Sequence, residues 1–161
     1  NPPHAGHQRI ADIATQRLRC PVAYELSITN VDKPPLDFVE IATRLKRIRD
    51  FGGQIPILLS DAPTFRAKAA LFPRCTFVVG AETMARIANP RYYSGDSGGL
   101  EAAIQLIADR GCRFLVFGRT LEGNFCSLSD LKLPPPLRRL CDEVTAEEFR
   151  ADISSTALRT P

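Results

Sequence analysis

Long apolar segments and long runs of one charge are both missing from this 161-residue sequence. No apolar run approaches the roughly 20 residues that a membrane-spanning helix needs, and no basic segment followed by an apolar one opens the chain as in a secretory signal. The 21 basic and 18 acidic residues leave a net charge of +3. The basic stretch 44–49 is interrupted by apolar residues at helical spacing, which is typical of a solvated helix face. We therefore expect a soluble, cytoplasmic protein that binds neither membranes nor nucleic acid.

Paired cysteines at a metal-binding or redox spacing are missing as well. The cysteines are five in number, no two of them are separated by two residues, and no histidine stands near them in the sequence to complete a zinc site. They are Cys20, Cys75, Cys112, Cys126 and Cys141. We interpret them as free thiols of a protein that works in a reducing compartment.

Short apolar runs alternate with amphipathic stretches, which is the pattern of a parallel sheet covered by helices on both faces. The runs predict strands in residues 22–28, 55–59, 76–79 and 114–117. The stretches predict helices near residues 8–19, 37–50, 63–71, 81–88 and 98–111. With right-handed crossovers, these elements predict a Rossmann-like three-layer α/β/α domain with a mostly parallel sheet. The length suits one domain over residues 1–161.

Polar residues follow each predicted strand at its carboxyl end, where sheets of this kind bind ligands. They are Ser27 and Asn30, Ser60 and Asp61, Gly80 and Glu82, and Gly118 and Arg119. Residues 121–136 show neither helical nor strand period and end in three prolines, so we predict a surface connection there. Residues 145–148 match a capping box, which predicts a short helix through Arg150.

Two motifs at the ends of the sequence carry groups that bind phosphate. The first is Asn-Pro-Pro-His-Ala-Gly-His in residues 1–7, directly before an apolar-periodic run. His4 and His7 would lie where a loop enters a helix, and a helix N-terminus offers unpaired N–H groups and about half a positive charge. Such a pair is also found on ordinary protein surfaces. Because these are the two histidines of the whole chain and the second motif is present, the phosphate-binding interpretation is favoured.

The second motif is Ile-Ser-Ser-Thr-Ala-Leu-Arg in residues 153–159. Its hydroxyls stand where a helix can start, and Arg159 follows Thr156 by about one helical turn. Hydroxyl, backbone N–H and guanidinium would then converge on one anion. The plain alternative is a helix cap followed by a solvated arginine.

These motifs, His-x-Gly-His and Ile-Ser-Ser-Thr-x-x-Arg, resemble those of the cytidylyltransferase-like nucleotidylyltransferase superfamily. Its members include nicotinamide or nicotinate mononucleotide, phosphopantetheine and glycerol-phosphate nucleotidylyltransferases. The likeness spans nearly the whole chain. Segments 25–36, 77–83, 89–93 and 118–119 are similar to nicotinamide mononucleotide adenylyltransferase-like proteins and to the nucleotidyltransferase-like domains fused to CinA-type domains. The resemblance also implies a strand directly before the first motif, which we expect upstream of Asn1.

The resemblance implies a role for each motif residue. His7 would contact the α-phosphate in the transition state and His4 the phosphates beside it, while Gly6 lets the backbone approach the nucleotide closely. Arg159, the third implied catalytic residue, would hold the β- and γ-phosphates through a bidentate contact. The implied nucleotide-binding residues are Gly6, Ser154, Ser155, Thr156, Gly80 and Arg119.

Three further residues are implied to contact the acceptor substrate: Lys33, Glu82 and Ser27. Lys33 lies on a stiff loop with two prolines and would reach a phosphate as a point charge; an exposed lysine is an equal alternative. Glu82 stands where related adenylyltransferases have the Asp of Gly-x-Asp, and an acid at a helix start is its alternative. Tyr92 and Tyr93 either line an acceptor pocket or pack in the core.

The sequence therefore predicts a nucleotidylyltransferase. In this reaction an acceptor phosphate oxygen attacks the α-phosphorus of a nucleoside triphosphate and pyrophosphate leaves, so the protein positions groups and neutralises charge. We expect transfer of AMP from ATP to a phosphorylated small molecule, a pyridine mononucleotide. Mg²⁺ would be held through the triphosphate. The alternatives are another acceptor such as phosphopantetheine or glycerol phosphate, CTP in place of ATP, a non-catalytic nucleotide-binding module, and a plain interaction domain; an oligomer stays open.

Overall fold

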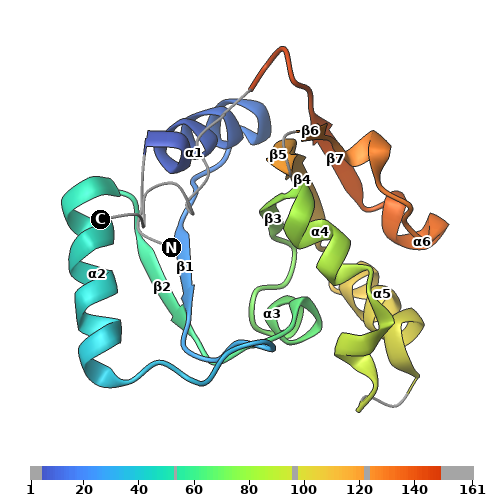
Figure 1. Cartoon of the computed structure of the whole chain (residues 1–161), viewed down its shortest axis with the longest axis horizontal. Coiled ribbons are helices and arrows are strands. Elements are labelled where there is room, and N and C mark those ends of the chain that lie inside the picture. Colours follow the sequence, from blue (N-terminus) through green and yellow to red (C-terminus); the bar gives the residue numbers. More distant parts are fainter. Residues whose placement is uncertain (1–4, 53, 96–97, 122–123, 150–161) are drawn as a thin grey trace. The chain divides into compact units, whose positions relative to one another are not determined.

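The computed structural model describes residues 5–52, 54–95, 98–121 and 124–149. They form two compact units (Figure 1), of which unit 1 runs to Pro63 and unit 2 begins at Thr64. The prediction of one domain over the whole chain stays a prediction, and each unit is described by itself.

Unit 1 is a short parallel strand pair with two helices. In chain order it contains α1 (Ala5–Leu18), β1 (Tyr24–Ser27), α2 (Phe38–Gly52) and β2 (Ile57–Ser60). The strands β1 and β2 lie side by side in Figure 1, in a register that pairs Tyr24 with Ile57 and Ser27 with Ser60. Parallel neighbours need a crossover connection, which α2 supplies. The side chain of Asp37 accepts a hydrogen bond from the Glu40 backbone N–H at 2.7 Å, satisfying one of the free donors at the start of α2.

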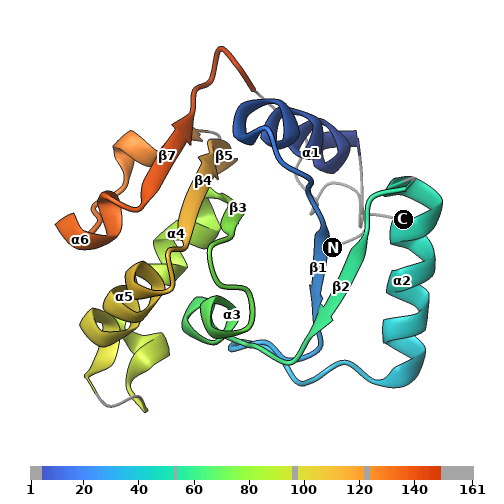
Figure 2. The ribbon, with the colours of Figure 1, turned by 180° about the vertical axis from the view of Figure 1, so that it is seen from behind.

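Unit 2 contains a three-stranded parallel sheet with β4 in the centre. Its elements are α3 (Phe65–Leu71), β3 (Thr76–Gly80), α4 (Ala81–Ile87), η1 (Pro90–Tyr93), α5 (Gly99–Asp109), β4 (Arg113–Phe117), β5 (Arg119–Leu121), β6 (Asn124–Cys126), η2 (Leu128–Asp130), α6 (Pro135–Arg138) and β7 (Cys141–Val144). The strand order is β3-β4-β7, and Figure 2 shows β4 between its two neighbours from behind. The α/β class with mostly parallel strands is confirmed and is compatible with a Rossmann-like three-layer fold.

The core of unit 2 is built around β4. All four residues from Phe114 to Phe117 are buried, as expected for a central parallel strand that is covered on both faces. The ring of Phe114 lies 5.7 Å from those of Phe65 and Phe77 between centroids. On the other side, the ring of Phe117 meets that of Phe149 edge to face at 5.2 Å, a favoured aromatic geometry. This strand fixes the sheet edge that carries the candidate site.

The prediction of a surface connection over residues 121–136 is wrong. Strands β5 and β6 form an antiparallel hairpin in which Arg119 pairs with Cys126, and η2 follows it. Leu128 of η2 is fully buried. The Asp130 carboxylate accepts from the Ser127 backbone N–H at 2.8 Å and from its hydroxyl at 2.7 Å, a local bond network that fixes a turn without any long sequence period.

The chain after α6 adds the edge strand β7, which the sequence patterns did not predict. Beyond it, residues 146–148 form a turn, and the Thr145 backbone N–H donates to the Glu148 carboxylate at 3.0 Å. This bond is one half of the predicted capping box. The predicted helix is wrong for residues 145–149, which form a single turn; its predicted last residue, Arg150, lies outside the described residues.

Candidate functional site

The predicted site residues fall into three groups. Outside the described residues lie His4, Ser154, Ser155, Thr156 and Arg159. Unit 1 contains Gly6, His7, Ser27 and Lys33. Unit 2 contains Gly80, Glu82 and Arg119, and these three come together at one edge of its sheet.

In unit 1, the first turn of α1 holds the described part of the first motif. The helix starts at Ala5, about three residues before the predicted start, so Gly6 and His7 lie in its first turn and not in the loop before it. Gly6 is buried and His7 is half-buried. The start of a helix carries the positive end of its dipole. This position suits an imidazole that acts on an anion.

Polar contacts tie the carboxyl ends of β1 and β2 together. The Ser27 hydroxyl donates to the Ala62 carbonyl at 3.0 Å, and the Thr29 hydroxyl donates to the Asp61 carboxylate at 2.7 Å. The Ser27 hydroxyl thus makes a structural bond to the chain that follows β2. A ligand contact by that hydroxyl would have to use its lone pairs. Lys33 is exposed in the loop that follows.

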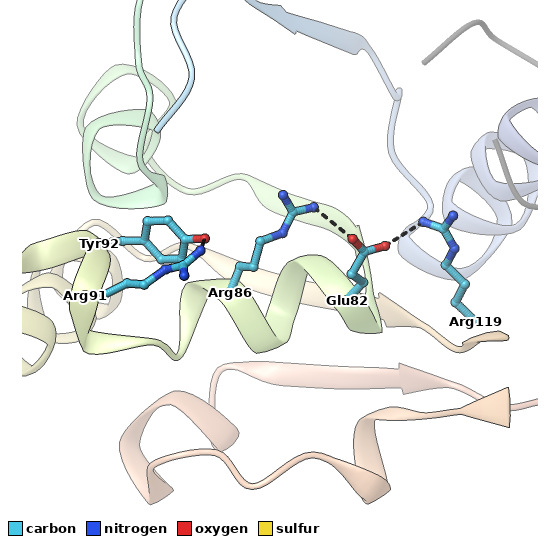
Figure 3. A network of polar contacts seen from close by, with 5 residues as sticks. All are labelled: Glu82, Arg86, Arg91, Tyr92 and Arg119. Atoms are coloured by element: carbon cyan, nitrogen blue, oxygen red, sulfur yellow. Dashed lines mark hydrogen bonds and ion pairs between the residues drawn. The ribbon is translucent and has the colours of Figure 1, made fainter. Parts of the chain in front are cut away.

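In unit 2, the edge formed by the carboxyl ends of β3 and β4 brings together an acid and two arginines (Figure 3). Gly80 ends β3 and directly precedes α4, whose first turn carries Glu82. Arg119 opens β5, two residues after β4 ends. Its Nη1 lies 2.9 Å from Oε2 of Glu82. The Nη2 of Arg86, one turn along α4, lies 3.4 Å from the other oxygen of the same carboxylate.

This cluster is accessible and has excess positive charge. The side chains of Glu82, Arg86 and Arg119 are 43%, 48% and 31% exposed. Two guanidinium groups share one carboxylate, so the local sum is one positive charge. Arginine presents several donors in a planar fork that matches a phosphate. The cluster therefore orients Arg119 while keeping a net attraction for an anionic ligand.

The backbone of Gly80 lies open beside this cluster. A side-chain carbon added at Gly80 would meet no atom of the described residues within 4 Å. By contrast, a carbon added at Gly118 would stand 2.3 Å from Cζ of Phe125. The ring of Phe125 therefore packs directly on Gly118. This contact fixes the start of the hairpin that carries Arg119.

The two tyrosines of η1 differ in burial and in the partner of their hydroxyl group. Tyr93 is buried and its hydroxyl donates to the Ile87 carbonyl at 3.1 Å, which supports the core-packing alternative for that residue. Tyr92 is half-buried, and the guanidinium of Arg91 lies 4.5 Å from its ring centroid and donates to its hydroxyl. Figure 3 shows this stacked pair near the same helix as Arg86.

Sequence reasoning missed Arg86 and Arg91. The spacing of four residues between Glu82 and Arg86 was a usable signal, since such pairs face each other on a helix. Arg91 lies in segment 89–93 of the family resemblance, but no spacing pattern predicted its contact with the adjacent Tyr92.

The described residues contain no group of three or more His, Cys, Asp or Glu side chains that could hold a metal ion. Glu82, the acid of the cluster, is engaged by two arginines and is poorly suited to ligate a cation. Within the same ranges, no helix combines the length and the apolar character required to cross a bilayer.

Known proteins provide no further guide to this site. Neither the models of protein families nor the curated sequences and solved structures that were compared with this chain give a match.

Proposed function

We propose that this chain is a nucleotidylyltransferase that transfers AMP from ATP to a phosphorylated small molecule, a pyridine mononucleotide, with release of pyrophosphate. The observation that carries the proposal is the ion pair between Arg119 and Glu82 at the carboxyl edge of β3 and β4. It holds a guanidinium, with net positive charge around it, at the edge where α/β sheets bind nucleotides.

The chemistry asks for positioning rather than for a covalent nucleophile. An acceptor phosphate oxygen attacks the α-phosphorus, the bond to the β-phosphate bridging oxygen breaks, and pyrophosphate carries the electron pair away. Charge on the phosphoryl oxygens is stabilised by preorganised donors. His7, in the first turn of α1, is assigned to the α-phosphate, and Arg119 to a phosphate of the nucleotide or acceptor.

We expect Mg²⁺ to be held at this site by the phosphates of the bound nucleotide and not by side chains of the protein. The described residues offer no acidic cluster, and Mg²⁺ is commonly held by substrate phosphates with few protein ligands. Bound in that way, the ion would neutralise charge on the leaving pyrophosphate.

The first test measures pyrophosphate release from ATP and from CTP with Mg²⁺. The acceptors are nicotinamide mononucleotide, nicotinate mononucleotide, phosphopantetheine and glycerol 3-phosphate. Release with ATP and a pyridine mononucleotide supports the proposal. Release with another pair keeps the class and changes the substrates, whereas ATP binding without release from any pair contradicts catalysis and favours a binding module.

A variant test addresses His7. We expect His7→Ala to lower kcat by two or more orders of magnitude without change in the circular dichroism spectrum, since loss of one transition-state donor costs about 10²–10³ in rate. Gln8→Ala is the matched control, because Gln8 is the next residue of α1 and its amide bonds Asp12 at 3.3 Å. Equal activity of His7→Ala and Gln8→Ala would contradict the assigned role.

A second variant test addresses Arg119. We expect Arg119→Gln to raise a substrate KM tenfold or more, because charge-assisted bonds to phosphate are lost. Arg139→Gln, an exposed arginine of the same unit, is the control. Unchanged KM values for both substrates would remove Arg119 from the site.

A further inference from the structure

Two cysteines occupy matching positions on neighbouring strands of unit 2. Cys75 stands one residue before β3 and Cys112 one residue before β4. The register pairs Thr76 with Arg113, so the two cysteines are direct cross-strand partners one step earlier. The Arg113 backbone N–H donates to the Cys75 carbonyl at 3.1 Å, which extends the strand pairing to this position.

The two turns that precede Cys75 and Cys112 are fixed by contacts with each other. Arg74 and Gly111, the residues directly before them, both adopt left-handed backbone angles, with φ of 61° and 67°. The Arg74 backbone N–H donates to the Arg110 carbonyl at 2.8 Å. A side-chain carbon added at Gly111 would lie 3.3 Å from Cγ of Arg74. The two turns therefore pack against each other and fix the spacing of the strand starts.

The two cysteines share one apolar environment. The Cys75 side chain packs against the core cluster that contains Cys112, and the Cys112 thiol donates to the Phe72 carbonyl at 3.3 Å. Cys112 is 1% exposed, whereas Cys75 is half-buried. Neighbouring strands lie about 4.8 Å apart, within the Cα separation of about 4.4–6.8 Å that a disulfide spans. Because registered residues of a parallel pair point to the same face, no change of register is needed to join them.

We propose that Cys75 and Cys112 are a redox modification site that closes to a disulfide when a small-molecule disulfide is present. The Cys75 thiol loses its proton and attacks one sulfur of the small disulfide, which releases one small thiol and leaves a mixed disulfide on Cys75. Cys112 then loses its proton and attacks the Cys75 sulfur, which releases the second small thiol. The protein loses two electrons and two protons, and the small disulfide gains them.

The location separates this modification from the proposed catalytic edge. Gly80, the last residue of β3, stands five residues after Cys75, a distance of about 16 Å at 3.3 Å per residue. The proposal therefore does not rest on the proposed function. Burial, together with the neighbouring Cys112, raises the pKa of the Cys75 thiol to about 12. The closure is thus slow near neutral pH, because the thiolate is the attacking species.

The test exposes the reduced 161-residue chain to oxidised glutathione at mildly alkaline pH. Free thiols are then counted in denaturant, and tryptic peptides are analysed by mass spectrometry. We expect Cys75 and Cys112 to account for the loss of two of the five thiols, with their peptides joined, in addition to any glutathione on the exposed Cys20. Cys75→Ser should lose the joined product entirely. Cys126→Ser, which removes another half-buried thiol of the same unit, should form it at an unchanged rate.

Three outcomes would overturn the proposal. The first is a Cys20 that carries glutathione while Cys75 and Cys112 both remain free thiols. The second is glutathione retained on Cys75 without transfer to Cys112. The third is a disulfide that joins Cys75 to any other cysteine or to a second copy of the chain.

Discussion

The two units bury very different side chains. In unit 1 the buried apolar residues among those described are mostly alanines: Ala11, Ala14, Leu26 and Ala62. In unit 2 the fully buried residues include Phe114, Phe117, Met84, Ile107, Leu115, Leu128 and Leu137. Because hydrophobic stabilisation scales with the apolar area removed from water, the core of unit 2 contributes far more to the stability of the chain.

The exposed apolar side chains show the same contrast. Phe38 and Val39 of α2 are 90% and 76% exposed, and Leu58 and Leu59 of β2 are both more than 40% exposed. A two-stranded sheet is marginal in water on its own, and β2 has apolar side chains on both of its faces. Unit 1 therefore carries large apolar side chains, as a protein core does, but leaves several of them exposed. From this comparison we expect the free energy of unfolding of the chain to depend mainly on the large buried side chains of unit 2. The number of helices and strands matters less.

The largest expected effect tests this contrast directly. Phe114→Ala removes a fully buried ring that contacts two others, and we expect a loss of about 3–5 kcal/mol in the free energy of unfolding. Leu58→Ala on β2, where the side chain is 41% exposed, should cost less than about 1 kcal/mol. Urea unfolding followed by circular dichroism measures both. Similar losses from the two variants would contradict the larger contribution of unit 2 to stability.

The next effect concerns the hairpin that carries Arg119. Gly118→Ala places a carbon where the Phe125 ring now lies, and we expect a cost of about 1–3 kcal/mol, typical of overpacking. The thermal midpoint measures it. The double variant Gly118→Ala with Phe125→Leu should recover part of the loss. A single variant as stable as the parent would show that the ring moves away freely.

A smaller effect is expected at the arginine–glutamate cluster. Glu82→Gln breaks two ion pairs between partly exposed groups, and such pairs contribute about 0–1 kcal/mol each. We expect stability to change by less than about 1 kcal/mol while substrate KM rises, because Arg119 loses the group that orients it. Unfolding and steady-state kinetics are measured on the same preparation. A large stability loss with unchanged KM would make the cluster structural.

The smallest effect is a pH dependence at η2. The Ser127 backbone N–H and hydroxyl, both donating to Asp130, lower the pKa of its carboxyl. A lowered folded-state pKa gives stability that is present above the unfolded value and lost as pH falls through the folded one. We expect Asp130→Asn to weaken the dependence of the urea midpoint on pH below about 4. If the urea midpoint of the variant fell with pH in the same way as that of the parent, the Asp130 carboxyl would not contribute to the loss of stability in acid.

The sequence predicted the strands and helices with a clear period. Strands β1 to β4 and helices α1 to α5 lie within about three residues of the predicted ranges, because their apolar residues repeat over several turns or fill a buried strand. The strands β5 and β6 have three residues each, too few to show a period. Strand β7 places Asp142 and Glu143 in its middle, which only an edge strand tolerates; pairing with β4 alone makes this possible.

At the candidate site, the sequence allowed the position of a residue to be predicted where it follows from a strand end. Gly80, Glu82 and Arg119 were expected at the carboxyl edge of the sheet and lie there together. That Arg119 pairs with Glu82 could not be predicted, because the contact depends on the hairpin that returns after β4. The catalytic assignments of His7 and the motif residues stay predictions.

The packing of Phe125 on Gly118 has a consequence for the evolution of this chain. The Phe125 ring occupies the space that a side chain at position 118 would need. A larger residue at 118 therefore lowers stability unless a smaller residue stands at 125. In related sequences these two positions should therefore vary together. A lineage that fills position 118 should show an altered hairpin, and with it a differently placed residue at 119.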